Sequence, residues 1–326
     1  YNKRGAVPAY EMIRHSVNIH RGCFGGCSFC TLAMHQGKFI ASRSEKSILA
    51  EVASITRMPD FKGHITDLGA PSANMYRMQG FDLKVCAKCT RPSCIFPKIC
   101  LNLNTDHKPL TDIYRKAAAV KGVKKVTIGS GVRYDMLAGR SKEDDKRFGL
   151  LEYTRQLVKY NVSGRLKVAP EHTSDAVLKI MRKPSFRLFH DFRKLFNDIS
   201  KSEGLNQQLI PYFISSHPGS RLQDMANLAL ETKEMGFRLE QVQDFTPTPM
   251  TLSSVIYWTG IHPFTGENVY SPRTKQEKLD QRQFFFWYKP EFRDSIRKSL
   301  AKAGENGLAD KLIGTRGISV SKSRIK

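Results

Sequence analysis

The sequence predicts an α/β fold, because short β-rich runs alternate with amphipathic helical stretches along most of the chain. Six strand–helix repeats of this kind fit a partial (βα)6, TIM-like barrel of parallel strands. The expected strands are residues 16–20, 64–68, 125–129, 165–169, 208–214 and 240–245. The expected helices are residues 45–57 (with Ser44 as N-cap), 112–120, 150–160, 174–181, 188–202 and 222–235.

Length and composition narrow the class of protein. The 326 residues predict about two domains, or one large barrel with an extension. Apolar residues make up 40% of the chain and charged residues 25%, which excludes a wholly disordered protein. No apolar run approaches the roughly 18 residues that a membrane span needs. We therefore expect a cytoplasmic protein with no membrane partner.

The chain is strongly basic, with 53 Lys and Arg residues against 30 Asp and Glu residues and a net charge of +23. Such a charge favours anionic partners, including nucleic acid and phosphorylated or carboxylated substrates. The basic residues are scattered rather than gathered in one stripe, so a solvated basic surface is the alternative explanation.

All seven cysteines lie before residue 101, in two groups. The first group has the spacing C-x3-C-x2-C, and the second has the spacing C-x2-C-x4-C-x5-C. Such tight spacing and an odd total argue against a disulfide framework and favour metal thiolates in a reducing compartment. The first group is Cys23, Cys27 and Cys30, and the second is Cys86, Cys89, Cys94 and Cys100.

Three thiolates at the first spacing can wrap one face of a small iron–sulfur cube and leave its fourth iron without a protein ligand. An open coordination position is typical of a catalytic metal site, where a substrate or cofactor binds. Gly22, Gly25 and Gly26 allow the backbone to bend tightly around such a cluster, and Phe29 is suited to packing flat against a planar ring. The alternative is a zinc site completed by His20 or His35.

The second cysteine group occupies an insert that Pro92 and Pro97 prevent from forming one continuous helix. Four cysteines within fifteen residues are enough to close a coordination sphere, with His107 as a substitute ligand. A structural zinc knuckle and an auxiliary [4Fe–4S] cluster both fit this pattern. A closed site predicts a structural or electron-relay role rather than substrate chemistry.

Polar residues, glycine and proline follow the ends of the expected strands, at the edge where a barrel of this kind places its chemistry. His172 and His217 are candidates there for substrate contact or proton transfer, although a lone histidine is more often structural. The segments at this edge are residues 69–72, 130–135, 170–172, 215–220 and 244–247.

The first cysteine group resembles the signature of the radical S-adenosylmethionine (SAM) superfamily, C-x3-C-x-aromatic-C. Together with four further segments, the chain resembles the YgiQ-type (UPF0313-like) branch, near the tRNA methylthiotransferases. The segments that carry this resemblance are residues 21–30, 66–76, 86–100, 170–174 and 245–250. The resemblance implies a radical SAM type barrel with a family-specific, mainly helical and irregular C-terminal extension.

The resemblance also implies a [4Fe–4S] cluster whose open iron binds SAM, and an external one-electron donor of the flavodoxin or ferredoxin type. One-electron cleavage of SAM would give a 5′-deoxyadenosyl radical that abstracts hydrogen from a substrate. Gly69, Ala70 and Pro71 occupy the place of the family's motif for the SAM amino group, although they lack its acidic residue. Ser130 and Glu171 become candidate ribose or methionine contacts, and Arg133 a partner for the SAM carboxylate and a catalytic candidate.

These expectations divide the chain into a lead-in at residues 1–14, a core at 15–245 with a cysteine-rich insert at 81–108, an extension at 246–313 and a disordered basic tail at 314–326. Since the first residue is not Met, we expect a piece of a longer polypeptide. The competing functions are an RNA-modifying, methylthiotransferase-like enzyme acting on an anionic substrate, a non-enzymatic iron–sulfur electron carrier, and a zinc-stapled nucleic-acid-binding protein.

Overall fold

A computed structural model describes residues 5, 7–239 and 242–314, and the chain forms two compact units. Unit 1 comprises residues 1–171, 178–212 and 247–254, and unit 2 comprises residues 172–177, 213–246 and 255–326. The chain passes between the units five times, and three of these crossings lie within α8 (Asp175–Met181), β8 (Gln208–Ser215) and α11 (Leu252–Thr259).

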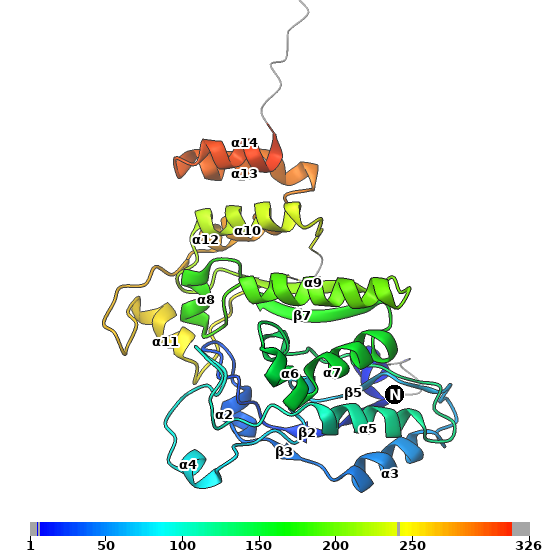
Figure 1. Ribbon diagram of the computed structural model, residues 1–326. Helices are drawn as coiled ribbons and strands as arrows, with labels where there is room; N and C mark the ends of the chain where they lie inside the picture. The colour runs from blue at the N-terminus through cyan, green and yellow to red at the C-terminus, as the bar shows by residue number, and fades with distance from the viewer. Residues whose placement is uncertain (1–4, 6, 240–241, 315–326) are drawn as a thin grey trace, which may run out of the picture. The chain divides into compact units, whose positions relative to one another are not determined.

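Unit 1 alternates short strands with helices (Figure 1). Its strands are β1 (Ser16–Asn18), β2 (His20–Arg21), β3 (Ala41–Ser42), β4 (His64–Ile65), β5 (Asp67–Gly69), β6 (Lys125–Val126) and β7 (Arg165–Glu171). Its helices are α1 (Pro8–Ile13), α2 (Leu32–Gln36), α3 (Glu45–Ile55), α4 (Leu83–Ala87), α5 (Lys108–Ala118), α6 (Lys142–Phe148), α7 (Leu150–Gln156) and α9 (Arg187–Ser202). Shorter turns are η1 (Ala73–Met75), η2 (Tyr134–Met136) and the π-helical η3 (Leu157–Asn161).

Most strand pairs are parallel. β1 pairs with β5, with Val17 opposite Leu68, and β4 pairs with β6. The backbone bond from Leu68 N to Thr127 O, 3.1 Å long, links β5 to the residue after β6. A further sheet has the order β7-β8-β9, and β2 and β3 form an antiparallel ribbon. The α/β class is therefore confirmed, although the strands of the described residues form four separate sheets and no closed barrel.

The longer helices of unit 1, α3, α5 and α9, each bury one apolar face. Helix α9 places Phe189, Phe192 and Phe196 three and four residues apart, and all three side chains are fully buried. The Tyr134 ring of η2 packs against the first two, with centroids 5.9 Å and 5.8 Å away. This contact fixes η2, the segment that carries Arg133 and Asp135, against a rigid helix.

Unit 2 is mainly helical. It contains β9 (Val242–Asp244), α10 (Leu222–Glu234), α12 (Lys275–Arg282), α13 (Arg293–Lys302), α14 (Asn306–Ile313), η4 (Gln283–Phe286) and η5 (Pro290–Phe292). Helices α13 and α14 lie side by side (Figure 1), joined by an ion pair between Arg297 and Asp310 at 2.8 Å. Lys233 of α10 donates from Nζ to the carbonyl oxygens of Lys311 and Leu312 in the last turn of α14. The C-terminal end of a helix carries a partial negative charge, so it attracts such a cation.

The expected helices are present with shifted ends. Helix α3 begins after Ser44, whose hydroxyl accepts from Ser47 N at 3.2 Å, so the predicted N-cap is confirmed. Helix α5 begins at Lys108, four residues earlier than expected. Pro109 suits this first turn, because proline lacks the backbone N–H that has no hydrogen-bond partner there. The expected helix at 150–160 ends as α7 and continues as the π-helical η3.

Other sequence expectations need correction. The expected strands at 16–20 and 64–68 are each split in two, and that at 125–129 is reduced to two residues. Helix α11 continues through Thr259. Phe284 and Phe285 of η4 are fully buried. The expected tail beyond Gly314 and the start of the strand expected at 240 lie outside the described residues.

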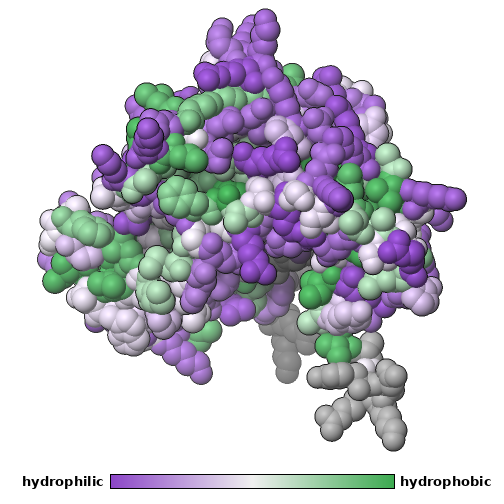
Figure 2. Space-filling view, turned by 90° about the horizontal axis from the view of Figure 1, so that it is seen from below, coloured by the Kyte–Doolittle hydropathy of each residue, from purple (hydrophilic) through white to green (hydrophobic). Residues whose placement is uncertain are grey.

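Within the described residues, no helix is both long enough and apolar enough to cross a membrane. Hydrophilic side chains cover most of the face drawn in Figure 2, with apolar residues between them.

We expect Phe192→Ala to lower the free energy of unfolding by about 3–5 kcal/mol, because a fully buried ring in contact with Tyr134 is lost. Lys194→Ala, on the exposed side of the same helix, is the control and should change it by less than about 0.5 kcal/mol. Urea denaturation followed by circular dichroism measures both. Equal effects of the two substitutions would contradict the packing described for α9.

Candidate functional site

The first cysteine group lies on a tightly bent loop that follows β2 in unit 1. Gly22 has a φ of +90°, and a Cβ there would lie 2.2 Å from the Phe39 carbonyl oxygen. Gly26 has a φ of +61°, and its Cβ would lie 2.1 Å from the Pro92 carbonyl oxygen. Both positions therefore require glycine, as the sequence predicted for this loop.

Hydrogen bonds fix the ends of the loop. Cys23 N donates to Gly37 O at 3.1 Å, and Ser28 N donates to Met181 O at 3.0 Å. The Ser28 hydroxyl lies 2.7 Å from both Ile180 O and the Ser253 hydroxyl. Cys30 N donates to Cys27 O at 3.2 Å, which closes the turn between these two cysteines.

Burial and neighbouring charges shift the pKa values of two thiols in this loop. Burial raises the pKa of Cys23, against the opposing charge of Arg133, and the thiol of Cys27 raises it further. Burial also raises the pKa of Cys30 to about 11, with smaller contributions from Cys27, Cys23 and Glu171. In the protein without metal these two thiols are thus protonated, and metal binding must release protons.

Arg133 brings a positive charge to the cysteine loop. Its Nη1 donates to Cys27 Sγ at 3.4 Å, while Nε and Nη2 donate to the Asp135 carboxylate at 2.9 Å and 2.5 Å. Burial alone would raise the pKa of Asp135, but the charge and hydrogen bonds of Arg133 outweigh it and lower this pKa. The pair is therefore ionised and buried, with one donor left for a cysteine sulfur.

Asn74 holds Arg133 in place from the other side. The Asn74 side chain accepts from Arg133 N at 2.7 Å and donates to Arg133 O at 3.1 Å. His107 lies beside it, with Nε2 3.3 Å from the Asn74 amide and Nδ1 2.7 Å from Thr105 O. Burial lowers the pKa of His107 to about 4, so this ring is neutral and supports Asn74.

Glu171 is a buried carboxyl with unused hydrogen-bonding capacity. Burial raises its pKa, and Lys183, whose Nζ lies 3.7 Å from Glu171 Oε1, opposes that shift. Glu171 Oε2 is buried and has no hydrogen-bond partner. The residue also has a φ of +71°, a backbone conformation that is costly for a side chain of this size.

The segment after β5 lies beside the cysteine loop. His20 Nε2 donates to Ser72 O at 3.0 Å, and the Ser72 hydroxyl lies 3.9 Å from Cys23 Sγ. A Cβ at Gly69 would lie 2.2 Å from the Ser130 hydroxyl. Ser130 itself donates to the Asp67 carboxylate through its hydroxyl and, at 3.2 Å, through its backbone N.

Unit 1 contains most of the residues singled out in the sequence, namely Cys23, Cys27, Cys30, Phe29, Gly69, Ala70, Pro71, Ser130, Arg133 and Glu171. Of the proposed SAM contacts, Ser130 and Arg133 already have protein partners, whereas Glu171 has a free oxygen. Sequence reasoning missed Asp67, Asn74 and Lys183. Asp67 and Asn74 both lie in the segment 66–76 that carries the family resemblance, whereas Lys183 has no local signal.

His172 and His217 belong to unit 2 and are fully buried. His172 Nδ1 accepts from Thr173 N and Ser174 N at 2.9 Å and 3.0 Å, and Nε2 lies 3.3 Å from the Ser220 hydroxyl. Burial lowers the pKa of each histidine to about 3. Both are therefore neutral, and His172 supports the turn that precedes α8.

The second cysteine group lies around one cavity of about 50 Å³ in unit 1. Cys86 belongs to the short helix α4, a regular element that the sequence did not predict, whereas the remainder of the insert is irregular as expected. Its four thiols share this cavity with apolar side chains, and Phe24, Met78 and Leu103 are buried at its wall. His107, the substitute ligand considered from the sequence, does not line it.

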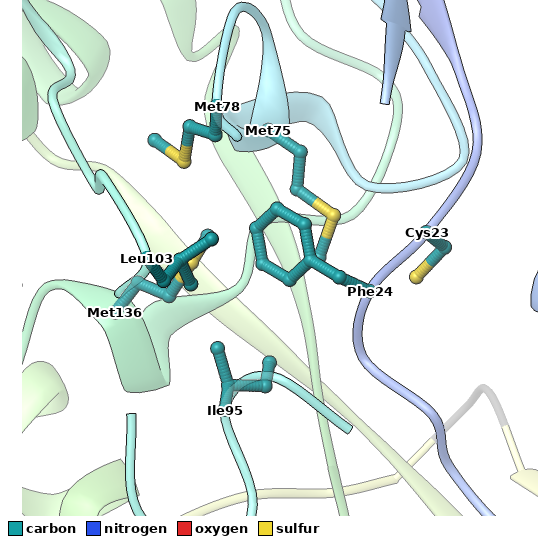
Figure 3. Close-up of a cluster of buried hydrophobic side chains, with 7 residues drawn as sticks. All are labelled: Cys23, Phe24, Met75, Met78, Ile95, Leu103 and Met136. Atoms are coloured by element: carbon teal, nitrogen blue, oxygen red, sulfur yellow. The ribbon is translucent and has the colours of Figure 1, made fainter. Parts of the chain in front are cut away.

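Phe24 connects the two cysteine groups. Its ring lies among Met75, Met78, Ile95, Leu103 and Met136, and Cys23 belongs to the same buried cluster (Figure 3). Cys94 and Cys100 pack against this cluster, and Cys94 N donates to Phe24 O at 3.0 Å. Apolar packing around Phe24 and one backbone hydrogen bond therefore link the two groups.

Comparison with family models gives one match at the C-terminal end, a domain of unknown function (DUF3362) at residues 240–316. Solved structures similar to part of the chain include the radical SAM methyltransferase TsrM from Kitasatospora setae, with cobalamin and a [4Fe-4S] cluster bound. It is 11% identical, with a TM-score of 0.46, and the match covers 74% of this chain and 38% of that one. The cobalamin-dependent SAM radical enzyme OxsB is 13% identical, with a TM-score of 0.48, and the match covers 89% of this chain and 36% of that one.

Curated relatives match nearly the whole chain. A UPF0313 protein of Bacteroides thetaiotaomicron is 61% identical over 95% of this chain and 50% of its own length. A UPF0313 protein of Porphyromonas gingivalis is 58% identical over 94% of this chain and 48% of its own length. The UPF0313 protein YgiQ of Escherichia coli is 43% identical over 95% of this chain and 41% of its own length. The chain spans about half the length of these relatives or less, and by this similarity it belongs to the UPF0313 family, which includes YgiQ.

Proposed function

We propose that this chain is the core of a radical SAM iron–sulfur enzyme, in which Cys23, Cys27 and Cys30 ligate a [4Fe–4S] cluster with one open iron. The observation that carries the proposal is that these three thiols lie on one tightly bent loop, which requires glycine at Gly22 and Gly26, with the Arg133 guanidinium beside Cys27. Three cysteines leave one iron free, which an electron-transfer cluster with four cysteines does not. The short parallel strands of unit 1 support a partial barrel around this loop.

The single-ion zinc alternative has less support from the geometry. Among the described residues, no three His, Cys, Asp or Glu side chains converge on a position for one metal ion. His20 donates its Nε2 proton to Ser72, and His35 is exposed on α2. A cluster places each thiolate on a different iron, so it does not require the sulfurs to meet at one point.

When bound, the cluster and SAM would supply one-electron cleavage of the sulfonium to methionine and a 5′-deoxyadenosyl radical, with the electron from a flavodoxin- or ferredoxin-type donor. The residues of this chain bind and orient these groups. Arg133 stabilises the Cys27 thiolate, and Asp135 keeps the guanidinium from turning away. Glu171 Oε2 is suited to accept a hydrogen bond from a ribose hydroxyl, because it is buried and lacks a partner.

The proposed substrate is anionic, in accordance with the net charge of +23. The neutral rings of His172 and His217 contribute no charge to binding or proton transfer near neutral pH. Their proposed role is to support the turns that follow β7 and β8. We infer that the hydrogen abstraction itself needs no acid or base from these two residues.

Replacing Cys27 with Ala should abolish SAM cleavage, because two thiolates cannot hold a cluster with one open iron. After anaerobic reconstitution, we expect 5′-deoxyadenosine formation to fall by more than about 100-fold, beyond the effect of losing a supporting residue. The SAM-induced change in the EPR spectrum of the dithionite-reduced protein should also disappear. His35→Ala, at the histidine that a zinc site would require, is the control and should behave like the parent. Parent-like product formation by C27A would show that Cys27 is not a ligand.

The double substitution Arg133→Gln and Asp135→Asn should make the midpoint potential of the first cluster more negative. The positive charge beside Cys27 Sγ favours the added electron, and removing both partners together leaves no unpaired buried charge. We expect SAM cleavage to slow by about 10–100-fold. EPR-monitored redox titration gives the potential.

The control for this experiment is Arg115→Gln with Glu152→Gln, an exposed ion pair of 2.9 Å on α5 and α7. It removes the same types of charge from an exposed pair that does not contact a cysteine ligand. The midpoint potential of the first cluster and the rate of SAM cleavage should therefore stay unchanged. An unaltered potential in the Arg133 variant would mean that the guanidinium does not act on the cluster.

A further inference from the structure

We infer that Cys86, Cys89, Cys94 and Cys100 hold a second iron–sulfur cluster, closed by four thiolates, and not a zinc ion. The four thiols line one cavity whose other walls are mostly apolar, including Phe24, Ile40 and Leu103. Four cysteines complete the ligand set of either kind of site. The distinction between the two comes from the space that the thiols enclose.

The cavity of about 50 Å³ is larger than a single ion requires. A site for one water molecule needs about 10–15 Å³ on the same scale, so this cavity accommodates several atoms. A zinc ion would instead draw all four sulfurs to about 2.3 Å from one centre. An iron–sulfur core has both the size and the separate attachment points that these thiols offer.

The sulfurs have donors of the kind that adjusts the potential of a cluster. Asn102 Nδ2 donates to Cys86 Sγ at 3.2 Å, and Lys38 Nζ lies 3.9 Å from Cys89 Sγ. Asn102 is fixed in turn by Asp82, whose backbone N and O bond to its side chain at 2.9 Å each. Hydrogen bonds to sulfur stabilise the reduced and more negative cluster, which raises its potential.

The chain around the cavity is shaped to leave room for these sulfurs. A Cβ at Gly80 would lie 2.3 Å from Cys86 Sγ, so any other residue would displace this ligand. Cys94 N donates to Phe24 O, the residue that follows Cys23. The apolar cluster that contains Cys23 and Phe24 therefore packs against Cys94 and Cys100 of this site.

The second site can be tested without the first. In the triple variant Cys23→Ala, Cys27→Ala and Cys30→Ala, anaerobic reconstitution with iron and sulfide should give about four irons and about four sulfides per chain. The iron–sulfur absorption should not respond to SAM, and zinc should be at background. One zinc per chain without sulfide, or no metal at all, would overturn the inference.

The complementary variant is Cys89→Ala with Cys94→Ala in the otherwise intact chain, because a single substitution would leave three thiolates, the number proposed to hold the first cluster. Iron should fall from about eight to about four per chain, since only the first cluster remains. Because the relation to the first loop rests on the proposed function, the EPR response to SAM is recorded in the same sample. Retained response with half the iron supports both assignments. Retained response with unchanged iron overturns the second site alone, and loss of response in the parent protein would overturn the proposed function alone.

Asn102→Ala should shift the midpoint potential of the second cluster to more negative values, because the hydrogen bond to Cys86 Sγ is lost. Iron content should be unchanged, since Asn102 is not a ligand. The measurement is a redox titration in the background of the triple variant, where the second cluster alone contributes. Lys84→Ala, on the exposed surface of α4, is the control. Equal potentials in the two variants would contradict the placement of Asn102 on the sulfur.

Discussion

The close contact between two backbone segments is the constraint on which the cysteine loop depends. The α-carbon of Gly26 faces the Pro92 carbonyl so closely that a Cβ would lie 2.1 Å from it. Two residues after Pro92, the backbone N of Cys94 donates to Phe24 O. The loop and the insert therefore hold each other in shape, and the position of the first group of thiols follows from the fold of the second.

Charge at this loop is organised by a buried ion pair. Taking two charges out of water is costly, and the attraction between them offsets that cost only when the remaining donors and acceptors are satisfied. Asp135 takes two donors of Arg133, Cys27 Sγ takes a third, and Asn74 bonds to the Arg133 backbone on both sides. This arrangement gives one cysteine a fixed cationic neighbour, which a flexible surface lysine would not provide.

The sequence predicted what repeats or has regular spacing, and missed what depends on distant contacts. Phe189, Phe192 and Phe196 reveal α9 by their periodicity, and the spacing of Cys23, Cys27 and Cys30 reveals a metal loop. Asn74 bonds to Arg133, 59 residues further along the chain, and Lys183 pairs with Glu171. No local sequence pattern reveals contacts between residues so far apart. Arg133 and Ser130 were identified, but their partners Asp135 and Asp67 were not, because pairing is a property of the folded chain.

Glu171 shows how a stable fold can retain capacity for a ligand. A buried oxygen without a partner costs about 1–3 kcal/mol, and a positive φ at a residue other than glycine adds strain. Lys183 reduces the electrostatic part of this cost at Oε1, while its Nζ donates to Ala169 O at 2.7 Å. Oε2 remains unpaired, so a ligand that donates to it recovers a penalty that folding has already incurred. The interaction would therefore favour binding more than an equivalent bond at the surface.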